Sequence, residues 1–353
     1  MSTIAELIGA ACQAAPSADN TQPCHCDWDG HNLNVRYDTP RVAGQTFAAN
    51  SPATLLAAGA IIENVAQLAN EHDIAINIEY WPEGPEQHEA IARIQLPNNG
   101  AISHTADGHY LARHTNRLPY HTRAIESEVV DQLSAMTAGT AGIQVFTDPS
   151  AKQQIAHLVK LASQIRFQTR EVHEWLGKSL RFSPAQVEQG DGLDIATLGL
   201  PPGGGMLLKL ISDWPRMDKL NRIGAYRMFA AIDSQPVRVA PAIVAFSADN
   251  TADGALDAGR LLCRAWTYIN SLGLAAHPYY VITDQMNRLQ DGTVPQRLVG
   301  LAEAIANESR ATFSLDEGQT LYMLLRVGYP KRTARRSQRL DQKRIFTDKT
   351  RAQ

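Results

Sequence analysis

Residues 113–117 read Arg-His-Thr-Asn-Arg, a pattern that can bind an anion. Each guanidinium presents a planar fork of N–H donors that matches phosphate or carboxylate oxygens, and a hydroxyl and an imidazole between the two arginines add further donors. Arg-x-x-x-Arg is also a common pattern, and the same residues could form a positively charged loop before a helix. The motif therefore predicts an anion site only where other residues support it.

A second polar stretch, residues 14–23, reads Ala-Ala-Pro-Ser-Ala-Asp-Asn-Thr-Gln-Pro. Proline fixes φ, and Ser, Asp and Asn hydrogen-bond to nearby backbone, so we expect a tight loop. The same side chains could point donors and acceptors at a flat polar ligand. Composition alone favours an ordinary connecting loop, and the remaining segments must decide between the two interpretations.

The bulk composition is typical of a globular protein. The chain has 353 residues, 44% hydrophobic and 20% charged, which is enough for one large or two smaller domains. A net charge of −3 gives no general attraction to nucleic acid, and four cysteines are too few for a disulfide scaffold. We expect no membrane span, because no apolar run reaches the ~18–20 residues that one needs, and the N-terminus lacks a signal-peptide pattern. We therefore expect a cytoplasmic protein.

Hydrophobic periodicity predicts the elements that must position the two polar stretches. A helix is expected over 3–14, strands over 33–37, 75–81 and 90–96, and a helix over 51–70. Ser51-Pro52 is a typical helix start. The helix that follows is apolar on all sides, which is typical of a helix in the protein interior.

The same helix and strand return 200 positions later. Ile61 and Ile62 correspond to Leu261 and Leu262, and six identities support the match, namely Leu56/Leu256, Ala58/Ala258, Gly59/Gly259, Asn70/Asn270, Ala75/Ala275 and Tyr80/Tyr280. A diverged internal duplication explains this pattern. The helix 3–14 and the strand 33–37 find counterparts at 129–137 and 143–147, with an offset near 125.

The two offsets differ by about 75 residues, which predicts an insertion between Asp148 and Arg238. Helical patterns at 155–175, 206–211 and 217–229 are joined there by Gly/Pro-rich loops. The insertion could be a lid or a passive cover. Beyond the second central helix we expect a strand at 279–281, a helix at 294–307 and a strand at 321–327, and a basic tail that is typical of a solvated arm.

Other motifs are weaker. Cys24-His25-Cys26 could bind a metal, but without a second ligand pair we expect ordinary packing of the thiols and no metal site. The chain has no Gly-x-Gly-x-x-Gly, and Gly203-Gly204-Gly205 lacks the Lys-Ser/Thr of a phosphate loop. The basic tail could touch RNA or DNA, but the aromatic and basic interleaving of such surfaces is missing.

Taken together, the two polar stretches resemble motifs of the nitroreductase superfamily. Residues 113–117 resemble its Arg-(Arg/His)-Ser-x-Arg signature, which grips the phosphate and pyrimidine side of FMN in that family. Residues 15–23 resemble its Ala-Pro-Ser-x-x-Asn-x-Gln-Pro loop, which reaches the flavin from the opposite subunit in homodimeric members. Residues 272–278 and 325–330 resemble the segment beside the flavin ring and the last core strand. Arg335, Arg336 and Arg339 fall where C-terminal basic residues reach the phosphate.

The two motifs occur once each, in different halves. The counterpart of the Pro-Ser loop, residues 138–142, has no Pro, Ser or Asn, and the first half starts too close to its helix to carry the arginine motif. This pattern is similar to the fused pseudo-dimers of the Acg-like branch, in which one composite site remains and a lid is inserted. Residues 189–192 and 198–202 are the candidate lid loops. Thr115 departs from the usual Ser.

The resemblance implies an α+β nitroreductase-like fold. It has two fused halves, each with a central buried helix and a mostly antiparallel sheet, and a helical lid insertion. Residues 1–104 form the first half, 105–330 the second half with the insertion at about 150–237, and 331–353 a basic C-terminal extension. FMN is the implied cofactor, and the residues expected to bind it are Pro16, Ser17, Asn20, Gln22, Arg113, His114, Thr115, Arg117, Ala275, Ala276, Arg336 and Arg339.

The implied activity is that of an FMN-dependent NAD(P)H oxidoreductase. Electrons would move from NADH or NADPH to a flat acceptor, a nitroaromatic or a quinone, by ping-pong chemistry without a catalytic acid or base. One alternative is an Acg-like stress protein that binds flavin, or has lost it, without turnover. Another is a flavin-dependent dehydrogenase of a peptide or natural product. We expect a monomer or weak homodimer, and neither a nucleic-acid nor a membrane partner.

Overall fold

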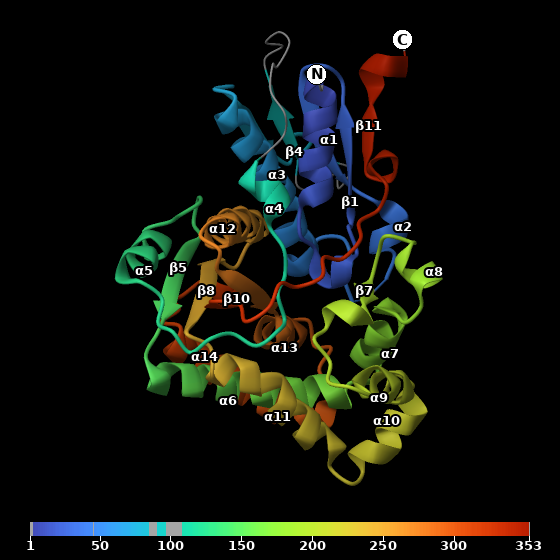
Figure 1. The fold of residues 1–353 in the computed structure, drawn as a ribbon, viewed down its shortest axis with the longest axis vertical. Helices are drawn as coiled ribbons and strands as arrows, with labels where there is room; N and C mark the ends of the chain where they lie inside the picture. Colours follow the sequence, from blue (N-terminus) through green and yellow to red (C-terminus); the bar gives the residue numbers. More distant parts are fainter. Residues whose placement is uncertain (1–2, 45, 85–89, 97–107, 353) are drawn as a thin grey trace.

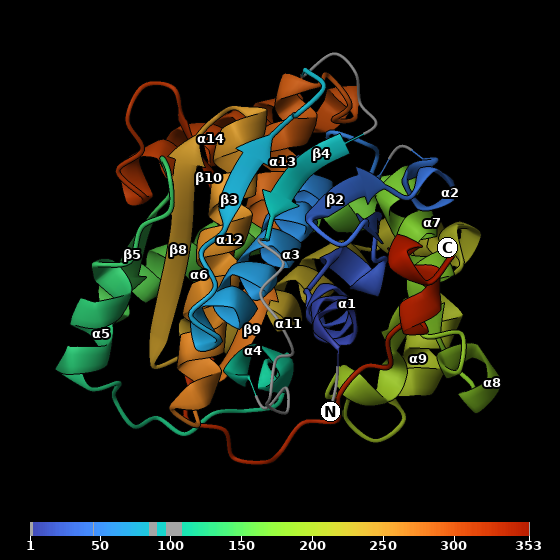
Figure 2. The same ribbon diagram turned by 90° about the horizontal axis from the view of Figure 1, so that it is seen from above.

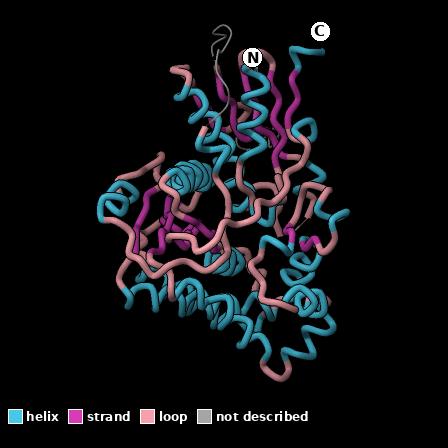
Figure 3. Tube along the Cα trace, in the orientation of Figure 1, coloured by secondary structure: helices cyan, strands magenta, loops and turns pink. Residues whose placement is uncertain are grey.

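The computed structural model describes residues 3–44, 46–84, 90–96 and 108–352, which form two sheets on either side of two long central helices (Figures 1 and 3). The fold is α+β, with two fused halves and a helical insertion, as predicted. The boundary expected at residue 104 lies outside the described residues. The first half consists of α1 (Ile4–Ala14), β1 (Cys24–Trp28), β2 (Asn32–Tyr37), α2 (Thr39–Val42), α3 (Pro52–Glu71), β3 (Asn77–Tyr80) and β4 (Ala90–Gln95).

The first central helix, α3, begins where the sequence predicts. The Ser51 side chain accepts a hydrogen bond from the Thr54 N–H, which caps one of the free amides of the first turn. By length and mean hydropathy (1.2) this helix is apolar enough to cross a membrane, contrary to the expectation that no segment would be. The structure places 83% of that window in the protein interior, so α3 serves as a core helix.

The second half repeats this arrangement around a second central helix. After the short α4 (His109–Ala112), the elements are α5 (Ser127–Ser134), β5 (Gly142–Phe146), β8 (Ala242–Asp249), α12 (Ala252–Ser271), β9 (Ala275–Tyr279), α13 (Val281–Gln290), α14 (Val299–Thr312) and β10 (Gln319–Gly328). The strand expected at 279–281 therefore ends at Tyr279, because Val281 already begins α13.

The two central helices cross at a pair of glycines with reciprocal contacts. A Cβ on Gly59 would lie 2.2 Å from the Leu256 carbonyl oxygen, and a Cβ on Gly259 would lie 2.4 Å from the Leu56 carbonyl oxygen. Each contact is the other one shifted by 200 positions, which is how a two-fold axis relates identical surfaces. Only glycine allows the two backbones to approach so closely.

The two sheets share one strand order. The first runs β11-β1-β2-β4-β3 and the second β5-β8-β10-β9, so β1, β2, β4 and β3 correspond to β5, β8, β10 and β9. Figure 2 shows β2, β4 and β3 of the first sheet side by side. This order corrects the sequence comparison, which matched the strand 33–37 to 143–147. The counterpart of β2 is β8, an apolar strand that the sequence analysis did not predict.

The insertion lies between β5 and β8, whose counterparts β1 and β2 form a hairpin. It contains α6 (Pro149–Gln168), α7 (Arg170–Ser179), β6 (Leu180–Arg181), α8 (Pro184–Val187), β7 (Leu193–Asp194), α9 (Gly204–Ile211), α10 (Trp214–Asn221) and α11 (Ala225–Arg238). The helix expected over 155–175 breaks near Thr169 into α6 and α7. The one expected over 217–229 is divided at Gly224, whose φ of 86° suits glycine.

The C-terminal segment is not a solvated arm. From Pro330 it returns along the front of the molecule to the first half, where β11 (Phe346–Asp348) pairs in parallel with β1 (Figure 1). Leu340 and Ile345 are buried on the way. Arg339 is thereby brought beside the loop of residues 14–22, while the other basic side chains between residues 331 and 344 stay exposed.

Candidate functional site

The arginine motif is an extended segment that pairs with the strand after the second central helix. Thr115 forms a parallel bridge with Ala276, and the Asn116 N–H donates to the Ala276 carbonyl at 2.9 Å. The His114 N–H donates to Asn270 Oδ1 at 2.9 Å. These contacts fix residues 114–116 beside β9 and the end of α12.

Arg113 is buried, with 7% of its surface exposed, and its charge is not neutralised. The guanidinium lies 4.6 Å from the centre of the Trp266 ring and donates to the Ala14 carbonyl at 2.9 Å. Its Nε is buried without a hydrogen-bond partner. Burial, and then the nearby Arg336 charge, lowers the pKa of Arg113 to about 10, as expected for a cation without a counter-ion.

Two arginines of the C-terminal segment, Arg336 and Arg339, lie close to Arg113. Arg339 donates to Asn20 Oδ1 at 3.0 Å and to the Ala14 carbonyl at 3.4 Å, and Arg336 donates to the carbonyls of Leu111 and Ala112. Burial, followed by the Arg113 charge, lowers the pKa of Arg339 to about 9. Across the described part of the chain, none of the three guanidinium groups pairs with a carboxylate. We call these three arginines with the loop 14–22 and residues 114–117 the arginine site.

The loop 14–22 is tightly wound and bonded to the chain itself. Asn20 and Gln22 both have positive φ, 58° and 51°, which non-glycine residues rarely adopt. The Asn20 amide donates to the Gln338 carbonyl at 2.9 Å, and the Gln22 amide donates to the Gly190 carbonyl at 2.9 Å while its oxygen accepts from the Leu340 N–H. The side chains expected to face a flavin therefore clasp the C-terminal segment and a candidate lid loop.

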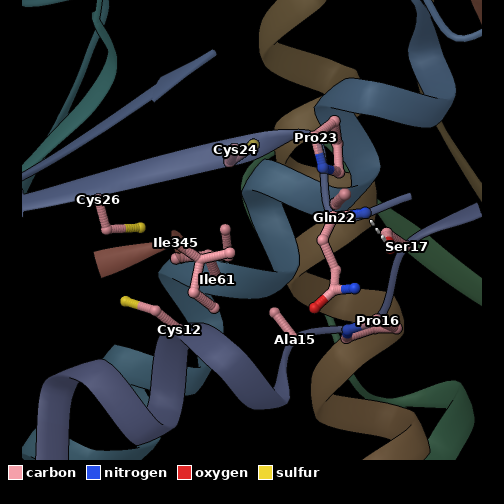
Figure 4. A pocket seen from close by; sticks show the side chains of 11 residues that line it. Cys12, Ala15, Pro16, Ser17, Gln22, Pro23, Cys24, Cys26, Ile61 and Ile345 are labelled. Carbon is pink, nitrogen blue, oxygen red and sulfur yellow. Dashed lines mark hydrogen bonds between the residues drawn. The ribbon is translucent and has the colours of Figure 1, made fainter. Parts of the chain in front are cut away.

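A small cavity lies behind this loop (Figure 4). Its volume is about 20 Å³, which is enough for about one water molecule. Pro16, Ser17 and Gln22 line it, and Ser17 Oγ accepts from the Gln22 N–H at 2.9 Å. Cys12, Cys24, Cys26, Ala57 and Ile61 are among the other lining residues.

The Cys24-His25-Cys26 motif does not gather its side chains. Because strand residues alternate, both cysteines of β1 are buried, while His25 turns outward and hydrogen-bonds to Thr347 at 2.9 Å. Among the residues that the structure describes, no group of three His, Cys, Asp or Glu side chains could hold a metal ion.

A second group, formed by Arg326 and His277, adjoins Arg117. Neither residue is predicted as a site residue from the sequence. Arg326 is 3% exposed, lies 4.0 Å from the centre of the Tyr120 ring and donates to the Leu118 carbonyl at 3.0 Å. Burial, and then the charges of Arg117 and Arg326, lowers the pKa of His277 well below its usual value, and its Nδ1 has no partner. Arg326 could have been identified in the sequence because it is a charged residue inside an otherwise apolar strand, β10.

Asp19 is an acidic group close to Arg117. Its charge opposes the lowering of the Arg117 pKa, which burial causes. Asp19 itself accepts a hydrogen bond from the Trp175 indole of α7 at 3.0 Å, and burial raises its pKa. The insertion is thereby tied to the loop of the first half.

The equivalent position in the other half is built differently. The Thr140 N–H donates to Asp257 Oδ2 at 3.1 Å, and the Tyr80 hydroxyl donates to Asp257 Oδ1 at 2.9 Å. Arg264 binds Glu63 with both guanidinium arms, at 2.6 and 2.9 Å, and donates to the Thr137 carbonyl at 3.0 Å. We call this cluster the Asp257 site.

The structure brings most of the predicted residues together. Arg113, Arg336, Arg339 and Asn20 form one cluster, and Ala276 is buried beside Thr115. Ala275, also buried, precedes it on β9, whereas Arg335 pairs with Asp194 and stands apart. Both candidate lid loops reach the site, since a Cβ on Gly190 would lie 2.4 Å from the Arg339 carbonyl and one on Gly199 would lie 3.2 Å from Leu118.

Comparisons with known proteins gave structural matches alone. No protein-family model matches the chain, and no curated protein matches it. An FMN-dependent nitroreductase of Mycobacterium smegmatis, solved with NADPH, aligns over 66% of this chain and 92% of its own at 14% identity and a TM-score of 0.37. A nitroreductase of Desulfitobacterium hafniense with bound FMN aligns over 67% and 94% at 14% identity and a TM-score of 0.36.

Proposed function

We propose that this chain is an FMN-dependent oxidoreductase of nitroreductase type with one cofactor site, formed by parts of both halves. The observation that carries the proposal is the cluster of Arg113, Arg336 and Arg339, which has no paired carboxylate within the described structure. Burying a cation such as Arg113 without a counter-ion costs free energy, so this cluster, to which the exposed Arg336 adds further donors, is expected where a ligand supplies the negative charge. The arginine and alanine-proline-serine motifs resemble the flavin-binding motifs of the nitroreductase superfamily, which points to FMN as that ligand.

The residues present fit the phosphate end of FMN. The buried Arg113 Nε has no partner and can donate to a phosphate oxygen, and Arg336 and Arg339 bring further N–H donors to the same place. Arg117 and the main chain around Ala275 and Ala276 would hold the ring. When bound, FMN would supply the redox chemistry, with NADH or NADPH as donor and a nitroaromatic or quinone as acceptor.

A specific observation favours a second candidate, a flavin-binding or flavin-free protein without turnover. The amides of Asn20 and Gln22, which would face the ring, already bond to Gln338, Gly190 and Leu340. Access to the ring end then requires the C-terminal segment and the loop 189–192 to move away. A protein in which that closure persists would hold flavin without exchanging electrons with nicotinamide.

The test is the colour of the purified full-length protein and its response to reductant. We expect one FMN per chain, with the absorption bands of oxidised flavin, and bleaching of these bands by NADH or NADPH. A yellow protein that neither nicotinamide bleaches would support the second candidate. A colourless protein that gains no flavin band when FMN is added would contradict the cofactor assignment. We also propose a cytoplasmic location and a monomer or weak homodimer.

A further inference from the structure

The insertion carries nearly all of the large apolar side chains that the described residues leave exposed. Eight of nine such side chains lie between positions 200 and 239, and the ninth is Leu272. Met206 and Ile223 are 82% and 83% exposed. The eight are Leu200, Met206, Leu207, Leu210, Ile223, Met228, Ile232 and Val239. A concentration of this kind marks an interaction surface, whereas single exposed apolar residues need no explanation.

Four of these side chains follow the helical repeat of α9 and α11. In α11, Met228 and Ile232 are four residues apart and lie on one side, while Ala230, Ser234 and Val237 of the same helix are buried toward the protein. In α9, Met206 and Leu210 are also four residues apart. The two helices and α10 lie together at the end of the molecule opposite both termini (Figure 1). We call the exposed surface formed by residues 200–239, which include these three helices, the α9–α11 face.

The α9–α11 face also carries an excess of positive charge. Residues 200–239 hold six cations and three carboxylates, although the whole chain has a net charge of −3. Each carboxylate already has an arginine partner, in the pairs Asp213–Arg216, Asp218–Arg222 and Asp233–Arg166. Four exposed cations are left without an ion pair among the described residues, namely Lys209, Lys219, Arg227 and Arg238.

We propose that the α9–α11 face docks on an anionic membrane surface. Exposed Met, Leu and Ile side chains flanked by Lys and Arg are the composition with which helices lie in a lipid–water interface, where the apolar groups enter the acyl boundary and the cations meet anionic headgroups. This inference is independent of the flavin proposal. It departs from the expectation, drawn from the sequence, that the chain has no membrane partner.

A second copy of the chain suits this face less well. In a two-fold dimer the same surface of each copy meets the other, so two surfaces that each carry four unpaired cations would be brought together. Like charges across an interface oppose association. The most exposed side chains, Met206 and Ile223, project from the surface and can enter a fluid interface.

The test is sedimentation of the full-length protein with lipid vesicles. We expect binding to vesicles of equal parts phosphatidylcholine and phosphatidylglycerol, weaker binding at high salt, and little binding to phosphatidylcholine alone. Replacing Met206→Ser and Ile223→Ser together should lower the partition coefficient by about tenfold or more. The matched control, Leu272→Ser, removes an exposed leucine outside the face and should leave binding unchanged. Circular dichroism would verify that each variant is folded.

Three results would overturn the proposal. The wild-type protein could stay in the supernatant with anionic vesicles at low salt. The double variant could bind as tightly as wild type, which would place the contact elsewhere. Sedimentation velocity could show a wild-type dimer that Ile223→Ser dissociates, in which case a second copy covers the face.

Discussion

The arginine site and the Asp257 site occupy equivalent positions beside the two central helices, yet they treat charge in opposite ways. In the arginine site, buried guanidinium groups bind carbonyl and amide oxygens. In the Asp257 site, Asp257 and Glu63 accept hydrogen bonds from the chain's own hydroxyl, amide and guanidinium groups. The position 200 residues before Asp257 is Ala57, which lines the cavity behind the loop 14–22. The comparison teaches that the carboxylates of the Asp257 site are satisfied by the chain itself, whereas the arginines of the other site have no carboxylate partner in the described structure, as the proposed anion ligand requires.

The framework around the two sites is nevertheless shared. Asn64 of α3 donates to the Ala11 carbonyl at 2.9 Å, and Arg264 of α12 donates to the Thr137 carbonyl at 3.0 Å. Both contacts hold the end of the first helix of a half against a central helix. The duplicated backbone contacts have been kept while the side chains facing each site have diverged.

The largest effect on stability should come from a substitution at the glycine crossing of α3 and α12, the two helices that both sites share. Gly59→Ala would place a methyl group against the Leu256 carbonyl, which is backbone and cannot move aside. We expect the free energy of unfolding to fall by about 3 kcal/mol, measured by urea denaturation. Gly300→Ala is the matched control, because nothing lies within 4 Å of its Cβ position in α14. That variant should be more stable by about 0.5 kcal/mol, and equal losses in both variants would contradict the close crossing.

Breaking the Asp257 site alone should destabilise the fold and spare the arginine site. Glu63→Gln leaves Arg264 and Arg260 without their buried carboxylate partner. We expect a loss of about 2–3 kcal/mol in unfolding free energy, below the upper range for buried pairs because Arg264 is 37% exposed. FMN affinity should not change. A variant with wild-type stability would show that the charges of this site are not needed to close it.

Breaking the arginine site should have the reverse outcome. Arg113→Ala removes the buried donor, and we expect the FMN dissociation constant to rise roughly thirtyfold, about 2 kcal/mol, in a fluorescence-quenching titration. Stability should change by less than about 1 kcal/mol, because no ion pair is lost. Arg123 provides the control, since it also stacks on an aromatic ring but is paired with Glu126. An equal loss of affinity in Arg123→Ala would remove the special role of Arg113.

A smaller effect concerns pH. The pKa of His277 is lowered in the folded protein by burial and by Arg117 and Arg326, so the unfolded chain takes up a proton first as the pH falls below about 6.5. Stability should therefore fall with pH in this range, and His277 should contribute about 1 kcal/mol to the loss between pH 6.5 and 5.5. Urea midpoints of wild type and His277→Asn at the two pH values test this. Parallel losses in the two proteins would show that His277 is not held neutral.

Much of the fold could be predicted from the sequence, because it depends on local periodicity. The apolar helix after Ser51, its copy 200 positions later and the place of the insertion were all readable as patterns. The motif of Arg113 and the loop around Asn20 could be matched to each other through a family resemblance, and the structure brings them into contact through Arg339.

The remainder depends on long-range pairing that no local pattern encodes. The short strand β11 joins β1 through the pair Cys26 and Phe346, so the path of the C-terminal segment could not be read from its basic composition. The strand β8 is apolar along most of its length and lacks the alternation that identified β2. Trp266 lies under the Arg113 guanidinium, but in the sequence it is simply one of the apolar residues of a buried helix.

The most direct test of the central claim is a comparison of FMN with riboflavin, which has the same ring and no phosphate. If the unpaired arginines form an anion site, the full-length protein should bind one FMN per chain about a hundredfold more tightly than riboflavin, which corresponds to about 2.7 kcal/mol of charge-assisted hydrogen bonds. Arg113→Ala should remove most of that difference. Equal affinities for the two flavins, or two equivalent FMN sites per chain, would contradict the account.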